Sequence, residues 1–133
     1  MAIETRHIPI RTGVDVVEAR TATRALATRV GFSGTDQVLL ATAVSEIARN
    51  IVEYARTGEV LVSSIEGTRP GVEIIALDDG PGIADIPKAL EMGYTTARGL
   101  GMGLPGARRL MDEFDIATRI GRGTTVKMRK WVT

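Results

Sequence analysis

Two amphipathic helical patterns follow each other along this chain with no strand between them. Apolar side chains recur at helical spacing over residues 15–30, which end at Gly31, and again from Thr35, the expected N-cap, to about Ala55. A doubly wound α/β fold requires strands and helices that alternate throughout, so this order excludes it. The two helices are expected to pack together on a sheet instead.

The strand-like segments are one N-terminal run, residues 5–11, and two pairs, 59–66 with 72–78 and 114–120 with 124–132. Pro9 has no N–H for a ladder hydrogen bond, so the first run belongs at a sheet edge. Turn-rich stretches, GTRPG and GRG, join the pairs and predict two hairpins. We therefore expect a single α+β domain over residues 1–133, a two-layer sandwich in which helices cover one face of a mixed, mostly antiparallel sheet.

Composition narrows the range of functions. The 133 residues carry 17 basic and 16 acidic side chains, so the formal net charge of +1 favours neither nucleic acid nor an anionic membrane. An aromatic content of 4% leaves few side chains for stacking on bases. The absence of cysteine excludes disulfides, thiol catalysis and cysteine-ligated zinc. Because the sequence has no apolar leader or spanning stretch, we expect a soluble, cytoplasmic protein with no nucleic-acid or membrane partner.

The stretch SEIARNI places Glu46 and Asn50 four residues apart and therefore on one face of the second helix. A carboxylate can act as a general base, and an amide oxygen is a hard ligand suited to Mg2+. The same spacing also suits a solvated helix face with an Arg49–Glu53 ion pair beside it. By itself this motif does not decide between the two interpretations.

The segment LDDGPGI ends the second strand of the first hairpin. Strand alternation puts Asp78 on the same face as Val72 and Ala76. If that face meets the helices, Asp78 is a carboxylate at the rim of an apolar pocket and needs a hydrogen-bond donor, such as the exocyclic amine of adenine. Gly80 and Gly82 would let the backbone approach a flat ring closely. A simple turn is the other interpretation, because Asp-Gly-Pro-Gly is favourable turn chemistry.

Residues 99–106, GLGMGLPG, contain the pattern G-x-G-x-x-G. A dinucleotide fingerprint directly follows a strand and leads to an acidic residue at the end of a second strand, and this loop meets neither condition. A Walker A motif is also excluded, because no Gly-Lys-Ser/Thr follows. The loop leads into a helix expected over 105–113. It is therefore either an anion site at a helix N-terminus, with Arg108 and Arg109 in the first turn, or a flexible surface loop.

Residues 121–125, GRGTT, join the last two strands. A hairpin bulge explains the glycines without any function. A threonine hydroxyl in this segment can also reach a ligand that lies near Asp78. Each motif is ambiguous when it is taken alone.

Together, the order and spacing of these motifs resemble the ATP-binding boxes of the GHKL superfamily, which includes gyrases, Hsp90, MutL, histidine kinases and anti-sigma-factor serine kinases. The resemblance spans essentially the whole chain and implies the Bergerat fold, in agreement with the two-layer sandwich. Because 133 residues leave no room for the further domains of gyrases or the dimerisation helix of histidine kinases, we expect a single-domain serine kinase of a bacterial partner-switching system. The segments SEIARNI, DDGPGI and GLGMGLPGARRLMDEF look like RsbT-type switch kinases of the stressosome.

The resemblance implies a role for each matching residue and two cofactors, ATP and Mg2+. Glu46 would polarise or deprotonate the acceptor hydroxyl, Asn50 would coordinate Mg2+ on the phosphates, and Asp78 would bind the adenine amino group. Further nucleotide-binding residues would be Gly80, Gly82 and Thr124, the last through water, with the triphosphate lined by Gly99, Gly101 and Gly103. Residues 84–98 would form a lid, and phosphate contacts by Arg98, Arg108 and Arg109 stay open.

The function implied by the resemblance is an ATP- and Mg2+-dependent protein serine kinase. Its substrate would be a serine on a STAS-domain antagonist, and it would then bind and activate a PPM-type serine phosphatase. The alternative is an anti-sigma factor that sequesters a sigma subunit and is released by an anti-anti-sigma STAS protein. Glu46 and Asn50 argue against a third alternative, a non-catalytic nucleotide-gated binding module.

Overall fold

The computed structural model describes residues 4–82 and 103–133. In chain order the elements are β1 (Thr5–Ile10), α1 (Gly13–Val30), α2 (Gly34–Asn50), a π-helical turn η1 (Ile51–Ala55), β2 (Gly58–Ile65), β3 (Gly71–Asp78), α4 (Gly103–Leu110), β4 (Glu113–Arg119) and β5 (Gly123–Trp131). The expected lid, residues 84–98, and two of the expected triphosphate glycines, Gly99 and Gly101, lie outside the described residues. No helix in the described parts of the chain is long and apolar enough to cross a membrane.

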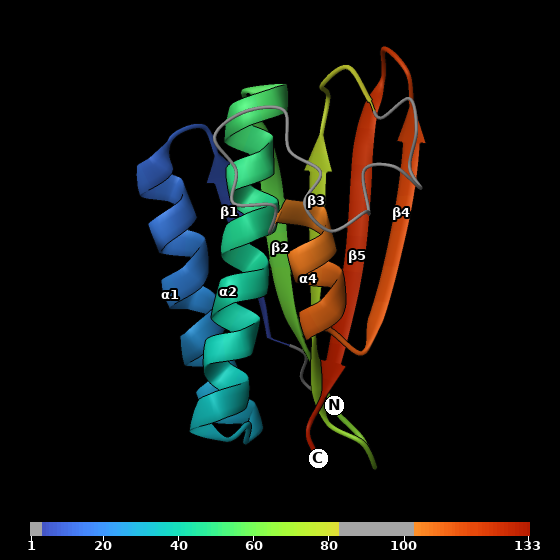
Figure 1. The fold of residues 1–133 in the computed structure, drawn as a ribbon. Coiled ribbons are helices and arrows are strands. Elements are labelled where there is room, and N and C mark those ends of the chain that lie inside the picture. The colour runs from blue at the N-terminus through green and yellow to red at the C-terminus, as the bar shows by residue number, and fades with distance from the viewer. Residues whose placement is uncertain (1–3, 83–102) are drawn as a thin grey trace.

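The five strands form one sheet in the order β1-β2-β3-β5-β4, so β1 and its Pro9 lie at an edge as expected. Every neighbouring pair of these strands is antiparallel, and the expectation of a mixed sheet is wrong for the described strands. The reason lies between β1 and β2, where the chain reverses three times, into α1, from α1 into α2 and from α2 into β2, so that β2 runs antiparallel to β1 (Figure 1).

All the described helices lie on one face of the sheet, which confirms the two-layer α+β sandwich (Figure 1). Along the central strands every second side chain turns toward the helices and is buried. These side chains join those of α1 and α2 in one core, whose largest fully buried apolar members are Ile8, Ile10, Leu26, Leu40, Val44, Ile47, Val60, Val62, Val72, Ile74 and Met128.

Helix α1 begins at a polar capping residue pair and ends at a glycine, and both features are present in the sequence. At its start, Asp15 Oδ2 accepts hydrogen bonds from the backbone N–H groups of Arg11 and Thr12, at 2.8 and 3.0 Å. These bonds favour the charged carboxylate and hold the pKa of Asp15 below its usual value. At its end, Gly31 takes the left-handed conformation with φ of 109°, as the stop signal predicts.

Helix α2 starts earlier than expected. Its N-cap is Ser33, whose Oγ accepts a hydrogen bond from the backbone N–H of Asp36 at 3.2 Å. The prediction of Thr35 as the cap is therefore wrong. Ser33 has the extended backbone of a capping residue, with φ of −62° and ψ of 161°, whereas Thr35 already lies inside the helix.

The end of α2 differs from a regular helix. After Asn50 the chain widens into the π-helical turn η1, which closes with a hydrogen bond of 2.7 Å from the Arg56 N–H to the Ile51 carbonyl oxygen. Arg56 has a φ of 75°, a value that a non-glycine residue adopts only at a cost of about 1–3 kcal/mol. The helical pattern predicted the extent of this segment to Ala55 but not its wider turn. π-helical turns occur often at functional sites.

Candidate functional site

The C-terminal end of β3 and the N-terminal end of β5 meet at one end of the sheet. Asp78, the last residue of β3, lies directly opposite Thr124 of β5 on one side and Gly58 of β2 on the other. The alternate side chains that precede Asp78 on β3 are buried on the helix-facing side of the sheet. Asp78 shares that side and is half-buried, whereas Asp79 is exposed. The structure thus selects the orientation in which Asp78 faces the helices.

The Asp78 carboxylate has one oxygen engaged within the chain. Its Oδ1 accepts a hydrogen bond of 2.8 Å from the backbone N–H of Gly80, which forms a tight turn after β3. Within residues 4–82 and 103–133 the carboxylate makes no other hydrogen bond or ion pair. A half-buried carboxylate oxygen in this position can accept a hydrogen bond from a ligand N–H group.

Gly80 and Gly82 lie where another part of the backbone passes very close. A Cβ atom added at Gly80 would lie 2.7 Å from the Cβ of Ala55 in η1. A Cβ atom added at Gly82, which has a φ of 80°, would lie 2.5 Å from the carbonyl oxygen of Arg119 at the end of β4. Both positions therefore need glycine for packing within the chain, whether or not a ligand also approaches them.

Gly123 is a site residue that the sequence did not single out for this role. It has a φ of 121°, and an added Cβ atom would lie 2.0 Å from the carbonyl oxygen of Asp78. The hairpin pattern accounts for a glycine here but not for its contact with β3. That contact depends on β5 lying beside β3, which only the sheet topology shows.

Thr124 follows Gly123 and lies opposite Asp78 in the ladder. Its Oγ1 is 3.0 Å from the Oγ1 of Thr118 on β4. The Thr118 hydroxyl also donates to the carbonyl oxygen of Gly123 at 3.1 Å. A hydroxyl group is both a donor and an acceptor, so Thr124 retains capacity for a water or a ligand beside Asp78.

Glu46 and Asn50 form a second group, on the face of α2 that meets α4. A Cβ atom added at Gly103, the first residue of α4, would lie 3.5 Å from Asn50 Oδ1 and 3.7 Å from Asn50 Nδ2. The Asn50 amide is thus placed beside the N-terminus of α4. Glu46 lies one turn earlier on α2, and its Oε1 accepts a hydrogen bond of 2.7 Å from Arg49 Nη1.

The π-helical turn η1 connects the two groups. At its start, Ile51 Cγ2 lies 2.9 Å from the position of a Cβ atom added at Gly58, the residue paired with Asp78. At its end, Ala55 packs against Gly80. The turn therefore joins the end of α2, with Asn50, directly to the glycine turn that holds the Asp78 carboxylate. The periodicity of the sequence does not predict this contact between η1 and the turn after β3.

Arg108 and Arg109 are not at the N-terminus of α4. The helix starts at Gly103 and ends at Leu110, so both arginines lie in its last turn. The expectation that they occupy the first turn is wrong, because the helix begins two residues before Pro105 and stops before Glu113. Arg98 lies outside the described residues.

Among the described residues, no cluster of three His, Cys, Asp or Glu side chains is placed to hold a metal ion. A divalent cation at this site would take the Asn50 amide oxygen, which lies beside Gly103 at the start of α4, as its described protein ligand. This arrangement fits Mg2+, which keeps several waters and is held largely by substrate phosphates with few protein ligands.

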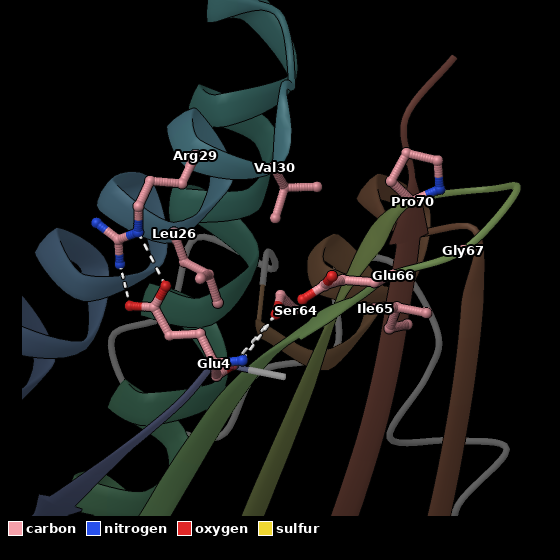
Figure 2. Close-up of a pocket in the computed structure, with 9 residues that line it drawn as sticks. All are labelled: Glu4, Leu26, Arg29, Val30, Ser64, Ile65, Glu66, Gly67 and Pro70. Atoms are coloured by element: carbon pink, nitrogen blue, oxygen red, sulfur yellow. Dashed lines mark hydrogen bonds and ion pairs between the residues drawn. The ribbon is translucent and has the colours of Figure 1, made fainter. Parts of the chain in front are cut away.

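A separate pocket lies at the other end of the sheet, between the end of α1 and the β2–β3 hairpin (Figure 2). Its volume is about 540 Å3, and its walls include Leu26, Val30 and Pro70. Arg29 Nε donates to Glu4 Oε1 at 2.9 Å, so these two charges neutralise each other, and a second carboxylate, Glu66, also lines the pocket. It contains none of the predicted site residues.

The profile of the histidine kinase-like ATPase domain family matches residues 10–130, from the end of β1 to the end of β5. The chain belongs to this family. The match takes in every described site residue of both groups. The Bergerat fold, which the four motifs implied, is thereby confirmed as the histidine kinase-like ATPase fold.

Two relatives of named function are similar to this chain over most of its length. The serine/threonine-protein kinase RsbT of Bacillus subtilis strain 168 is 44% identical over 126 residues, which cover 94% of this chain and 95% of RsbT. The anti-sigma F factor of Thermoanaerobacter sp. strain X514 is 30% identical over 119 residues, which cover 86% of this chain and 83% of that protein. The resemblance to RsbT-type serine kinases is confirmed by the first of these matches.

Solved histidine kinases share the fold. The mycobacterial sensor histidine kinase MprB superposes with a TM-score of 0.57 at 16% identity, over 95% of this chain and 97% of that one. Full-length ShkA in complex with AMPPNP gives a TM-score of 0.59 at 21% identity, over 100% of this chain and 33% of that one. Because the sequence identities are this low, the similarity supports the fold of the chain and says nothing about its activity.

Proposed function

We propose that this chain is an ATP- and Mg2+-dependent protein serine/threonine kinase. The observation that carries the proposal is the Asp78 carboxylate, which is half-buried at the end of the sheet, with one oxygen bound to the Gly80 N–H and the other without a partner among the described residues. Supporting it, a serine/threonine-protein kinase, RsbT, is 44% identical over 94% of the chain.

Asp78 recognises the adenine. Its free oxygen accepts a hydrogen bond from the exocyclic amino group, and Thr124, directly opposite in the ladder, binds the same ring through a water molecule. Gly80 and Gly82 keep the turn after β3 close-packed against η1 and β4, so the carboxylate is held in place before the nucleotide arrives. A preorganised acceptor of this kind discriminates well against rings that lack the donor.

The triphosphate lies between Asn50 and the N-terminus of α4. Backbone N–H groups in the first turn of a helix have no acceptor within the helix and attract anions. Gly103 has no side chain between the start of α4 and the Asn50 amide, and that amide oxygen would hold Mg2+, which offsets the phosphate charge. Gly99 and Gly101, outside the described residues, are proposed to line the same triphosphate.

Glu46 is the general base. It lies one turn before Asn50 on α2, on the side that meets α4, so an acceptor hydroxyl beside the terminal phosphate comes within reach of its carboxylate. Glu46 accepts the proton of the serine hydroxyl as the serine oxygen bonds to the phosphorus and the bond to ADP breaks. Phosphoryl transfer depends chiefly on positioning and charge neutralisation, which these residues supply.

The acceptor proposed here is a serine on a STAS-domain antagonist protein, and the chain then binds a PPM-type serine phosphatase. A second candidate function is that of an anti-sigma factor that sequesters a sigma subunit, which the 30% identity to the anti-sigma F factor favours. Both functions use the same nucleotide site. They differ in the partner that is held.

Phosphate transfer from γ-32P-ATP in the presence of Mg2+ to a panel of purified STAS-domain proteins tests this proposal. Transfer to one serine is expected, with a loss of about 100-fold or more in Glu46→Gln. Asp78→Asn should lose transfer at low ATP concentration, and the exposed Asp79→Asn serves as the matched control. Failure of the unaltered chain to label any STAS protein would refute the kinase function. Retention of a sigma subunit in a pull-down without transfer would favour the second function.

A further inference from the structure

Arg49 contacts the carboxylate of Glu46 directly. Its Nη1 lies 2.7 Å from Glu46 Oε1, one turn apart on α2. The sequence pattern paired Arg49 with Glu53 instead. Glu53 lies in the π-helical turn, where the backbone is wound differently from an α-helix, and it makes no ion pair among the described residues. The structure therefore gives Arg49 one acidic partner, and that partner is the proposed base.

The carboxylate of this pair is largely buried, as is that of the Arg129–Glu73 pair, in which the Glu73 side chain is also 19% exposed. The Glu46 side chain is 19% exposed and that of Arg49 is 47% exposed, whereas the Arg29–Glu4 pair is 49% and 43% exposed. A carboxylate that has lost most of its contact with water gains more from a charge-assisted hydrogen bond than an exposed one does. Arg49 therefore restricts the orientation of a largely enclosed carboxylate.

The helical geometry leaves the catalytic side of Glu46 open. At about 100° per residue, Asn50 lies roughly 40° to one side of Glu46 around the α2 axis, and Arg49 lies roughly 60° to the other side. The guanidinium thus binds Oε1 from the flank opposite Asn50. The second oxygen, Oε2, has no partner among the described residues.

Arg108 and Arg109, the described arginines that follow the glycine loop, do not supply this contact. Arg108 and Arg109 lie in the last turn of α4, at the end of the helix away from Gly103 and Asn50. Within the described parts of the chain, Arg49 is the cation in contact with the base.

We propose, on the basis of the kinase function above, that Arg49 is a positioning residue for Glu46. It holds Oε1 and so directs Oε2 toward the acceptor hydroxyl. In the transfer step, Oε2 takes the proton of the serine hydroxyl while the serine oxygen bonds to the terminal phosphorus and ADP leaves with the electron pair of the broken bond.

The kinetics of transfer separate this role from a structural one. The STAS-domain protein labelled by the unaltered chain is the probe, and initial rates are measured while its concentration and that of ATP are varied. Arg49→Ala is expected to slow transfer at saturation by about 10–100-fold, since the base is no longer held in a productive orientation. Half-saturating concentrations of ATP and of the STAS protein should change by less than about twofold, because Arg49 touches neither in this role. Arg49→Lys keeps a cation within reach of Oε1 and should restore the rate to within about threefold.

Arg29→Ala is the matched control, since it also removes one ion pair, the one with Glu4 (Figure 2), but at the end of α1 and away from the candidate site. It should leave the transfer rate unchanged. An unchanged transfer rate in Arg49→Ala would overturn the positioning role. A higher half-saturating concentration of the STAS protein with no change in the rate at saturation would also overturn it, because Arg49 would then be a docking residue. Both outcomes leave the kinase function intact. If the unaltered chain transfers no phosphate to any STAS protein, both the kinase function and the positioning role are refuted.

Discussion

Replacement of Asp78 by Asn should weaken ATP binding by about 10–150-fold and leave the fold intact. The amide oxygen of Asn can keep the 2.8 Å hydrogen bond from the Gly80 N–H, so the turn after β3 survives. The NH2 group then takes the place of the free carboxylate oxygen and meets another donor, the adenine amino group. Loss of a hydrogen bond to a charged group costs about 1.5–3 kcal/mol, and 1.4 kcal/mol is about tenfold in affinity.

Calorimetric titration with two nucleotides assigns the effect to the amino group. ATP carries the exocyclic amine, and purine riboside triphosphate lacks it but is otherwise the same. The unaltered chain should prefer ATP by a factor similar to the loss in the variant, whereas Asp78→Asn should bind the two nucleotides nearly equally. Asp79→Asn makes the same change of charge at the exposed neighbour and should keep the preference.

Two results would refute this reasoning. One is an Asp78→Asn variant that still prefers ATP over purine riboside triphosphate as strongly as the unaltered chain does. The other is an equal loss of ATP affinity in Asp79→Asn, which would assign the effect to net charge. Thermal unfolding of both variants checks that the fold is retained.

Three further predictions concern stability, each measured by urea unfolding. Gly123→Ala should cost about 3 kcal/mol or more, because its Cβ atom would lie 2.0 Å from the Asp78 carbonyl oxygen, whereas Gly31→Ala, which has a similar φ of 109° but nothing within 4 Å, should cost about 1–2 kcal/mol. Ser33→Ala should cost about 1 kcal/mol through loss of the cap, and Thr35→Ala should be nearly neutral; the reverse order would contradict the assigned cap. The folded-state pKa of Asp15 is lowered, so its charged form stabilises the fold above the unfolded-state value and this stability is lost as the pH falls through the folded-state pKa. Asp15→Asn should therefore be less stable than the unaltered chain at neutral pH, and the difference should shrink below about pH 4.

Local patterns in the sequence were sufficient for the elements of the fold. The spacing of apolar residues predicted α1 and α2, and alternation with intervening glycine and proline predicted the two hairpins, because these features depend on neighbours a few residues apart. Pro9 likewise placed β1 at an edge. The direction of β2 relative to β1 could not be predicted from local patterns, because it depends on how two consecutive helices return the chain to the sheet.

The candidate site was predicted in part, through motif residues whose order resembles a known family. The structure brings Asp78 opposite Thr124 and Asn50 beside Gly103, although residues far apart in the chain supply each pair. The roles assigned to these residues, and to Gly99 and Gly101 outside the described segments, stay predictions. Gly123 was missed as a site residue because its contact with β3 spans the sheet.

The sequence by itself determined which segments become helices and strands, which face of each is apolar, and which polar residues can do chemistry. Those properties follow from side-chain periodicity and from the conformational preferences of glycine and proline. Tertiary structure alone decided that Asp78 faces the helices and that η1 ties Asn50 to the Gly80 turn. Each of these outcomes depends on how separate elements pack, and packing is set by contacts between residues that no local pattern connects.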